Sequence, residues 1–341
     1  MSAPRSEGSV LDTLQGSDRR AGRGTRLTAA LADVGLDIRD ETAPLEAVIL
    51  GSAHDCGEPT RHNLTDSAYC ASGQAPMEKD LVAEVEGFRS VLSDLGVQVV
   101  HPGNLPGTQQ VFARDLAFVI GEKFFWGNLK RADRRAEREE LRRTLAVLAP
   151  DLIAVEPPAH MLLEGGDIVL LDGKVFVGVG CTPGRRRTDP EAVGFLQSHL
   201  PDWEVIPLRT RASDEPGSGD DPRKHVLHLD CAFQPLGSGH AVIFEDGFSE
   251  RPDAIFDSVG AGSLIKVSGE EMFQLGVNIL SVSPDTVIST PGATRLNHQL
   301  REVGLTVLEV PYREVTKQGG AFRCSTLPLR RRYRDDKPPT A

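Results

Sequence analysis

One cysteine and three acidic segments of this chain could together do chemistry on a cationic carbon. Cys324 follows the pair Gly319-Gly320, where the backbone can bend sharply. The acidic segments lie upstream at 112–115, 163–167 and 228–230, and their polar side chains include Asp115, Glu164, Asp167, His228 and Asp230. A thiol attacks well only as a thiolate, which a cation held between carboxylates favours. The pattern therefore predicts a cysteine nucleophile acting on a guanidinium-like group.

Each of these residues also has a structural interpretation. An isolated cysteine is commonly a small buried hydrophobe, although Cys324 has the glycine bend and the acids beside it in its favour. Asp167 either serves the site or caps a hairpin turn. His228 and Asp230 are two residues apart on a predicted strand, so they share one face. Cys231 should then point to the opposite face, into the core.

Composition limits the class of protein. The chain has 341 residues and is 39% hydrophobic, which is enough for a globular core. Its net charge of -11 argues against general affinity for nucleic acid or anionic membranes and is compatible with a small cationic substrate. The basic stretch 130–143 also contains acids at helical spacing, which is typical of an exposed helix with internal ion pairs.

Cysteine usage and the composition of the two ends predict the cellular compartment and the bounds of the folded domain. The 5 cysteines are widely spaced and contain no CxxC pair, which favours a reduced, cytoplasmic setting without zinc. No signal sequence or membrane span is expected. Residues 1–43 are predicted to be a disordered arm with a helical patch at 27–34, and 330–341 a disordered tail. A single catalytic domain is predicted over 44–329.

The elements that must position the site residues form a repeat. Asp115, Asp167 and Asp230 each precede an apolar hairpin, whose tight turns contain Gly-Glu-Lys, Asp-Gly-Lys and Gly-Ser-Gly. A helix and a further strand are expected after each hairpin. These pairs are predicted at 134–148 and 152–155, at 190–200 and 203–207, and at 270–275 and 278–282.

Two further units fit the same plan. The first has a strand at 45–50, a helix at 77–95 and a strand at 97–101. The last begins at 286 and has a helix at 295–303, a strand at 306–310 and a closing strand at 322–329. Five such ββαβ modules predict an α/β fold, a five-fold pseudosymmetric propeller with helices outside. A ring would bring the aspartates together. A doubly wound sheet is the alternative.

The order Arg114-Asp115, Glu164-Gly165-Gly166-Asp167, His228-x-Asp230, Gly319-Gly320-x-x-x-Cys324 resembles the guanidino-group-modifying (pentein) superfamily. The likeness extends over nearly all of 44–329 and is greatest to the branch of dimethylarginine dimethylaminohydrolase-like and arginine deiminase-like proteins. Each motif alone is weak, whereas four in this order are specific.

The resemblance implies a role for each residue of these motifs. Cys324 would be the nucleophile, His228 the general acid and base, and Glu164 the group that orients His228. Asp115 and Asp230 would clamp the guanidinium nitrogens.

Two more substrate contacts are predicted from less specific signals. Arg187, before Thr188, resembles a family segment in which an arginine binds the substrate α-carboxylate, although a solvated basic run is the commoner interpretation of 185–187. Asn63 could reach the site from a loop, but such loops are polar in any case.

Several functions remain open from the sequence. The first is a hydrolase that converts arginine, or an N-substituted arginine such as dimethylarginine, to a citrulline-type product through an S-alkylthiouronium. The alternatives are an amidinotransferase, which the Glu164-Gly165-Gly166-Asp167 form speaks against, an arginine dihydrolase giving ornithine, and a non-catalytic scaffold. No cofactor and no metal is expected. The expected partner is a small guanidino compound, with a homodimer left open.

Overall fold

A computed structural model of the chain describes residues 35–59, 61–213 and 219–333. Within these ranges the strands form five three-stranded sheets that share one plan. In each sheet a middle strand pairs antiparallel with one neighbour and parallel with the other. Helical segments connect the two parallel strands, as a parallel pair requires a crossover.

The sheets follow one another along the chain. The first contains β1 (Leu45–Leu50), β2 (Gln98–Val100) and β15 (Thr326–Arg331), with α3 (Leu64–Ala71) and α4 (Glu78–Asp94) between β1 and β2. The second contains β3 (Ala117–Ile120), β4 (Lys123–Trp126) and β5 (Ala154–Val155), with α5 (Arg135–Leu148). The third contains β6 (Ile168–Leu171), β7 (Lys174–Gly180) and β8 (Glu204–Thr210), with α6 (Glu191–His199).

Two sheets complete the fold. The fourth contains β9 (Phe233–Pro235), β10 (Ala241–Ile243) and β11 (Leu264–Lys266), with α7 (Asp253–Val259). The fifth contains β12 (Leu280–Ser283), β13 (Thr286–Ser289) and β14 (Thr306–Glu309), with α9 (Thr294–Glu302). Two short helices, α8 (Gly269–Phe273) and α10 (Arg313–Thr316), lie in the connections on either side of the fifth sheet.

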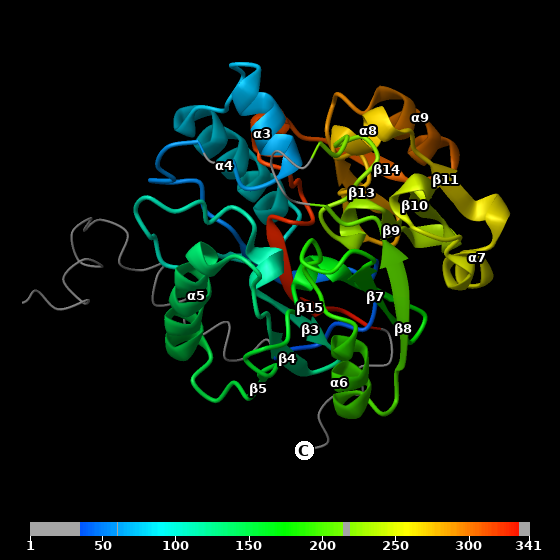
Figure 1. Ribbon diagram of the computed structural model, residues 1–341, viewed down its shortest axis with the longest axis horizontal. Helices are drawn as coiled ribbons and strands as arrows, with labels where there is room; N and C mark the ends of the chain where they lie inside the picture. Colours follow the sequence, from blue (N-terminus) through cyan, green and yellow to red (C-terminus); the bar gives the residue numbers. More distant parts are fainter. Residues whose placement is uncertain (1–34, 60, 214–218, 334–341) are drawn as a thin grey trace, which may run out of the picture.

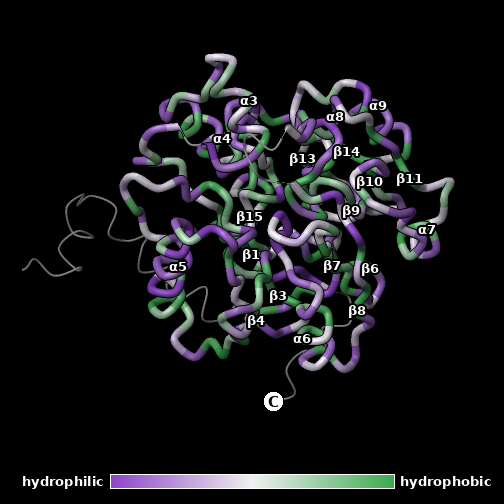
Figure 2. Tube along the Cα trace, in the orientation of Figure 1, coloured by the Kyte–Doolittle hydropathy of each residue, from purple (hydrophilic) through white to green (hydrophobic). Residues whose placement is uncertain are grey.

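The helices lie toward the periphery of the molecule and the strands toward its middle (Figure 1). Much of α5 and α9 is hydrophilic, whereas the inner strands are more hydrophobic (Figure 2). In α5, Leu141 and Leu145 are buried while most of the charged residues face solvent, so this helix covers the core with one stripe. Burial of such stripes against the apolar strands stabilises each module, since the sheets are too small to be stable alone.

The predicted α/β class and most of the predicted elements are confirmed. The strand at 45–50, the helices at 77–95 and 134–148 and the three aspartate-led hairpins are present with small changes at their ends. The doubly wound alternative is wrong, because the strands of the described residues form separate three-stranded sheets. The arrangement of the modules about a common axis remains a prediction.

The helix and strand assigned to the fourth module are wrong. The segments 270–275 and 278–282 were predicted, but α7 and β11 supply these elements. The predicted helix corresponds to the connecting helix α8, and the predicted strand overlaps β12 of the next sheet. The cause is length: β11 has 3 residues and α7 has 7, too few for a clear hydrophobic period.

The last strand closes on the first. β15 pairs antiparallel with β1, with Leu50 opposite Thr326 and Ile49 opposite Leu327, so the C-terminal strand belongs to the first sheet rather than the last. The antiparallel pair of the first sheet therefore joins the two ends of the chain.

Part of the predicted N-terminal arm packs on the fold. Residues 1–34, including the expected helical patch, lie outside the described residues, but 35–43 are described. Ile38 is buried and exchanges backbone hydrogen bonds with Gly121, and Asp37 does so with strand β15 through Leu329 and Arg331. In the predicted tail, 330–333 are described and β15 ends at Arg331.

Candidate active site

Three short 3-10 turns carry the acidic residues to one place. They are η1 (Ala113–Leu116), η3 (Gly165–Asp167) and η4 (Leu229–Cys231), each directly before the hairpin of its sheet. The turn η3 lies against both η1 and η4. The glycines make this close approach possible, because a Cβ on Gly165 would lie 2.1 Å from the carbonyl oxygen of Arg114. A Cβ on Gly166 would lie 2.7 Å from the ring of His228.

His228 is fully buried between two carboxylates. Its Nε2 lies 2.8 Å from Oε2 of Glu164, and its Nδ1 lies 3.6 Å from Oδ1 of Asp115. Burial alone would lower the pKa of His228, but the charges of Asp115, Glu164 and Asp167 raise it to about 10. The imidazole is therefore held as an imidazolium at neutral pH.

Glu164 is held as a carboxylate by cations on both sides. Arg187 Nη1 lies 3.1 Å from its Oε2, and the backbone N–H of Lys130 donates to its Oε1 at 2.9 Å. Burial alone would raise the pKa of Glu164, but Arg187 and His228 lower it to about 2. Arg187, predicted to bind a substrate carboxylate, is thus buried against Glu164 as well as lining the cavity described below.

Cys324 and Asp230 form the second part of the cluster. The Cys324 thiol is buried and donates to Oδ2 of Asp230 at 3.3 Å, and Arg323 Nη1 contacts the same oxygen at 3.0 Å. The hydrogen bond with Cys231, burial and the charge of Asp230 raise the pKa of the Cys324 thiol well above its ordinary value. Cys324 is therefore held as a thiol.

The turn that carries Cys324 is shaped by one asparagine. Asn278 Oδ1 accepts from the backbone N–H groups of Ala321 and Cys324, at 3.1 and 3.0 Å, and its Nδ2 donates to the carbonyl of Asp230 at 3.3 Å. A Cβ on Gly320 would lie 2.9 Å from Cβ of Cys324, which explains the small residue in the turn.

The two predicted clamp carboxylates are bound in the same way. Asp115 Oδ2 accepts from Arg134 Nη1 at 2.6 Å, and Asp230 Oδ2 accepts from Arg323 Nη1 at 3.0 Å. The other oxygen of Asp115 has no hydrogen-bond partner among the described residues, and that of Asp230 accepts only from the weak donor Cys231, at 3.5 Å. Each carboxylate thus keeps one oxygen for a further donor.

A cavity of ≈ 120 Å³ adjoins this cluster. It is lined by Asp115, Arg134, Arg187, Asn63 and Gln318, among others. Asn63 caps α3: its Oδ1 accepts from Thr65 and Asp66, and its Nδ2 donates to the carbonyl of Gln318. The predicted substrate contact Asn63 therefore lies at the cavity wall with its side chain already bonded.

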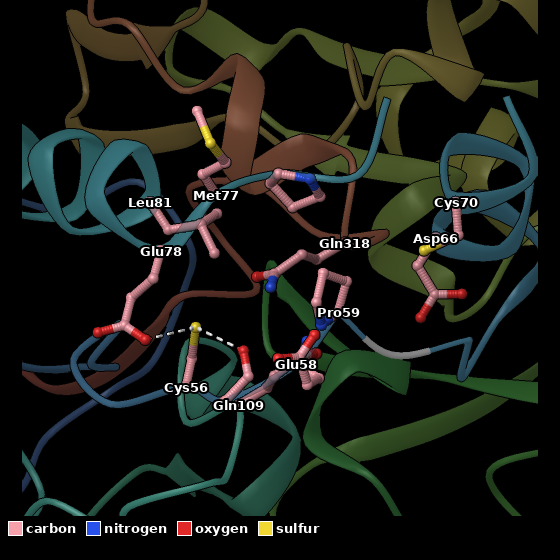
Figure 3. A pocket seen from close by; sticks show the side chains of 12 residues that line it. Cys56, Glu58, Pro59, Asp66, Cys70, Met77, Glu78, Leu81, Gln109 and Gln318 are labelled. Carbon is pink, nitrogen blue, oxygen red and sulfur yellow. Dashed lines mark hydrogen bonds between the residues drawn. The ribbon is translucent and has the colours of Figure 1, made fainter. Parts of the chain in front are cut away.

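A second cavity of ≈ 220 Å³ shares Asp66, Gln109 and Gln318 with the first (Figure 3). Cys56 and Cys70 both line it, and Cys56 points toward Glu78, with Sγ 3.7 Å from Oε2 (Figure 3). Burial, followed by the charge of Glu78, raises the pKa of Cys56 to about 11, so this thiol is a poor rival nucleophile.

Two predictions about the geometry of the third turn are wrong. The segment 228–231 is not a strand, because His228 is the residue before the 3-10 turn η4. With three residues per turn, Cys231 does not point away from Asp230 but donates to its Oδ1. Cys231 therefore belongs to the site cluster, and it is also buried in the hydrophobic core, as predicted.

Other site residues were missed by the sequence analysis. They are Arg134, Asn278, Arg323 and Glu41. Glu41 binds Arg323 Nη2 at 2.7 Å, and its pKa, which burial alone would raise, is lowered to about 2 by Arg323 and Arg114. The position of Arg323 beside Cys324 was the only sequence signal for this ion pair.

Two groups in the described residues have the side chains and spacing to hold a metal ion. One is Asp115, Glu164 and His228, and the other is Asp230, Cys231 and Cys324, with ligand atoms within 4.8 Å of one another in each group. The expectation of a metal-free site remains a prediction.

No helix of the described residues has the length and hydrophobicity needed to cross a membrane.

Among known proteins, this chain is 33% identical over 245 residues to the uncharacterized protein YkgA of Bacillus subtilis, covering 72% of this chain and 77% of that protein. It is 25% identical over 230 residues to the bifunctional arginine dihydrolase/ornithine cyclodeaminase AgrE of Nostoc, covering 66% of this chain and 30% of that protein. An arginine deiminase of Latilactobacillus sakei is 24% identical over 206 residues, covering 50% of this chain and 47% of that protein.

Solved structures share the fold. The N-terminal domain of ArgZ matches with a TM-score of 0.70 and 20% identity, covering 84% of this chain and 98% of that one. The inosamine-phosphate amidinotransferase of Streptomyces griseus matches with a TM-score of 0.68 and 19% identity, covering 87% and 97%. A family model described as N,N dimethylarginine dimethylhydrolase, eukaryotic, matches residues 61–331. The chain therefore belongs to this family, in the dimethylarginine dimethylaminohydrolase-like and arginine deiminase-like branch of the pentein superfamily.

Proposed function

We propose that this protein is a cysteine-dependent hydrolase of guanidino compounds. Its substrate would be arginine or an N-substituted arginine such as dimethylarginine, and its products a citrulline-type urea with ammonia or an amine. The observation that carries the proposal is the pairing of two buried carboxylates, Asp115 and Asp230, on either side of the acid His228 and the thiol Cys324.

Binding would begin with the carboxylates. A planar guanidinium donates in a fixed fork. Among the described residues, Asp115 Oδ1 has an ion-pair contact with His228 but no hydrogen-bond partner, and Asp230 Oδ1 accepts from the weak donor Cys231. The cation placed between them opposes the negative field that keeps the Cys324 thiol protonated. Substrate binding would therefore lower the pKa of the nucleophile at the moment it is needed.

The chemical steps follow from the positions of the two proton carriers. As the cation binds, the Cys324 thiol releases its proton to solvent. Its Sγ then forms a bond to the guanidinium carbon, and the imidazolium of His228 gives its proton to the departing nitrogen as the C–N bond breaks, which releases ammonia or an amine. The S-alkylthiouronium that remains is attacked by water, whose proton passes to the now neutral His228. The C–S bond then breaks as the added hydroxyl loses its proton to solvent, releasing the urea product and the thiolate, which takes up a proton again when the product leaves.

Glu164 and Arg187 would act through His228. Glu164 keeps the imidazole protonated and fixes its Nε2, so that Nδ1 is the nitrogen directed at Asp115 and the substrate. Arg187 keeps Glu164 ionised and also lines the cavity, where an α-carboxylate would meet its charge.

Product analysis tests this proposal. Purified protein is incubated with arginine, dimethylarginine and agmatine in ¹⁸O-labelled water, with Cys324→Ala as the control, and products are identified by mass. Hydrolysis predicts one labelled urea oxygen and one ammonia or alkylamine per turnover, unaffected by glycine or by a chelator. Dependence on an added amine would instead establish the transferase. No turnover of any guanidine by the folded protein would favour the scaffold.

An arginine dihydrolase is the second candidate, because AgrE, with which the chain shares 25% identity, is named for that activity. In that case arginine and two water molecules would give ornithine, carbon dioxide and two ammonia molecules, with citrulline at most transient. The same assay separates the two, since a hydrolase that stops at the urea accumulates citrulline.

A further inference from the structure

The nucleophile Cys324 has a second thiol beside it. Cys231 and Cys324 are both buried, and their sulfur atoms lie within 4.8 Å of each other. They come from different modules: Cys231 ends the turn η4 before β9, and Cys324 precedes β15. The sequence pattern had predicted that Cys231 would point away from Asp230 and so from this cluster.

One carboxylate holds both thiols. Cys231 Sγ donates to Asp230 Oδ1 at 3.5 Å and Cys324 Sγ donates to Asp230 Oδ2 at 3.3 Å. The two sulfurs are thus turned toward the same carboxylate. Two donors fix Asp230 in place: Arg323 Nη1 donates to its Oδ2, and Asn278 Nδ2 donates to its backbone carbonyl. A disulfide has an S–S distance of ~2.0 Å, so rotation of the side chains has to bring the sulfurs together by less than about 3 Å.

The other cysteines differ from this pair. Cys181 is exposed and its thiol contacts Thr182, and Cys56 is directed at Glu78 (Figure 3). In the described residues the two ligand clusters contain no thiols other than Cys231 and Cys324.

We propose that Cys231 and Cys324 form a reversible disulfide modification site whose oxidant is a hydroperoxide. Cys324 sulfur attacks the peroxide, the O–O bond breaks, and a sulfenic acid and one water or alcohol result, with the thiol proton passing through Asp230. Cys231 sulfur then attacks Cys324 sulfur, the S–O bond breaks, and a second water leaves. Two thiols are oxidised and one peroxide is reduced; a dithiol reverses the change.

The consequence for activity depends on the proposed function, whereas the disulfide itself does not. The disulfide removes the nucleophile from use, and it also stops oxidation before the irreversible sulfinic acid. Cys231 would be the resolving thiol.

Peptide mapping after oxidation tests the site without any substrate. The full-length protein is treated with hydrogen peroxide and a chelator, free thiols are alkylated, and the digest is searched for a peptide pair linking 231 to 324. We expect this pair in most molecules and its loss after dithiothreitol. Oxidation of Cys324 with Cys231 still open to alkylation, or a link between other cysteines, would overturn the proposal.

Matched variants sharpen the result. Cys231→Ser keeps a donor to Asp230 but cannot form the disulfide, so peroxide should drive Cys324 to the sulfinic acid, and dithiothreitol should no longer restore the free thiol. Cys181→Ser should retain the 231–324 link. A reversible Cys324 modification in Cys231→Ser would contradict the assignment. If this variant does not fold, as judged by circular dichroism, the peptide map of the unaltered protein still decides.

Discussion

The two carboxylates of the site, Asp115 and Asp230, are held alike but affect different partners. Each has its Oδ2 bound to a buried arginine, Arg134 or Arg323. Asp115 faces the imidazole of His228 and raises its pKa, and Asp230 faces the thiol of Cys324 and raises that pKa as well. Negative charge thus keeps both the imidazole of His228 and the thiol of Cys324 protonated.

The high pKa of Cys324 would protect the resting site from side reactions. A protonated thiol reacts slowly with ordinary electrophiles, and a positive group between Asp115 and Asp230 would reverse the effect on Cys324. The field of the site is therefore suited to a cation, and its two proton carriers would change together when that cation arrives. Substitutions can separate the pair of Asp230 and Cys324 from the pair of Asp115 and His228.

Replacement of Cys324 should have the largest effect. Cys324→Ala removes the thiol that donates to Asp230 Oδ2, and we expect turnover of any guanidine substrate to fall by ~10⁴-fold or more. Release of the urea product is the measurement. The exposed Cys181, changed to Ser, is the matched control and should leave turnover unchanged. A covalent adduct trapped at low pH on another cysteine would place the nucleophile elsewhere.

Replacement of His228 should stop the cycle half-way. His228→Gly leaves the Cys324 side intact, so reactive substrates should still alkylate the thiol, while hydrolysis falls by roughly 10³-fold because the proton carrier is gone. Mass spectrometry of the intact protein should detect the accumulating thiouronium. Steady-state turnover at the normal rate would remove His228 from the mechanism.

Replacement of Asp115 should weaken binding more than chemistry. Asp115→Asn keeps the shape but loses the charge, and we expect KM to rise by about 10–100-fold, the value of a charge-assisted hydrogen bond. The pKa of His228 should also fall, since Asp115 is the largest raising charge, and NMR titration of the ring checks this. An unchanged KM would mean that the guanidinium is bound without Asp115.

The ion pair between Glu164 and His228 should give a small pH dependence of stability. The folded pKa of Glu164 is lowered from 4.5 to about 2, so its contribution is present above pH 4.5 and is lost as pH falls toward 2. The folded pKa of His228 is raised from 6.5 to about 10, so its contribution is present below pH 6.5 and is lost as pH rises through 10.

Glu164→Gln tests this sign. The Tm of the variant should change less with pH than that of the unaltered protein, both below pH 4.5 and above pH 6.5. Between these two pH values its Tm should be lower, by about 2–4 °C for each kcal/mol of stability lost. Differential scanning calorimetry across pH is the measurement. A variant whose Tm follows the same pH curve as the unaltered protein would show that the pair contributes nothing.

The sequence predicted the site motifs because each motif is a local pattern. Asp115, Asp167 and Asp230 lie at one position of their modules, and Glu164 and His228 come shortly before two of them. The structure brings Asp115, Glu164 and His228 together, and it places Asp230 beside Cys324, although the roles of these residues remain proposals. Hairpins and long helices were found for the same reason, since their periods extend over enough residues to be recognised.

What could not be predicted depends on contacts between distant segments. Arg134 and Arg323 are bound to acids 19 and 93 residues away, and nothing local distinguishes them from surface arginines. Glu41 was placed in a loose arm because its neighbours are polar, yet one buried ion pair with Arg323 ties that segment to the site. Cys231 was misplaced because a period of two was assumed where the backbone makes a 3-10 turn.

The pairing of β15 with β1 also sets the order in which the site can come into existence during synthesis. Ribosomes release the chain from its N-terminus, so the carboxylates and His228 emerge long before Cys324. β1 can pair with β2 early, but its antiparallel partner β15 lies about 280 residues further along the chain, so this long-range contact closes late. A nascent chain can thus gather the groups that recognise a cation before it has the sulfur to react with one, and reactivity arrives with the final strand.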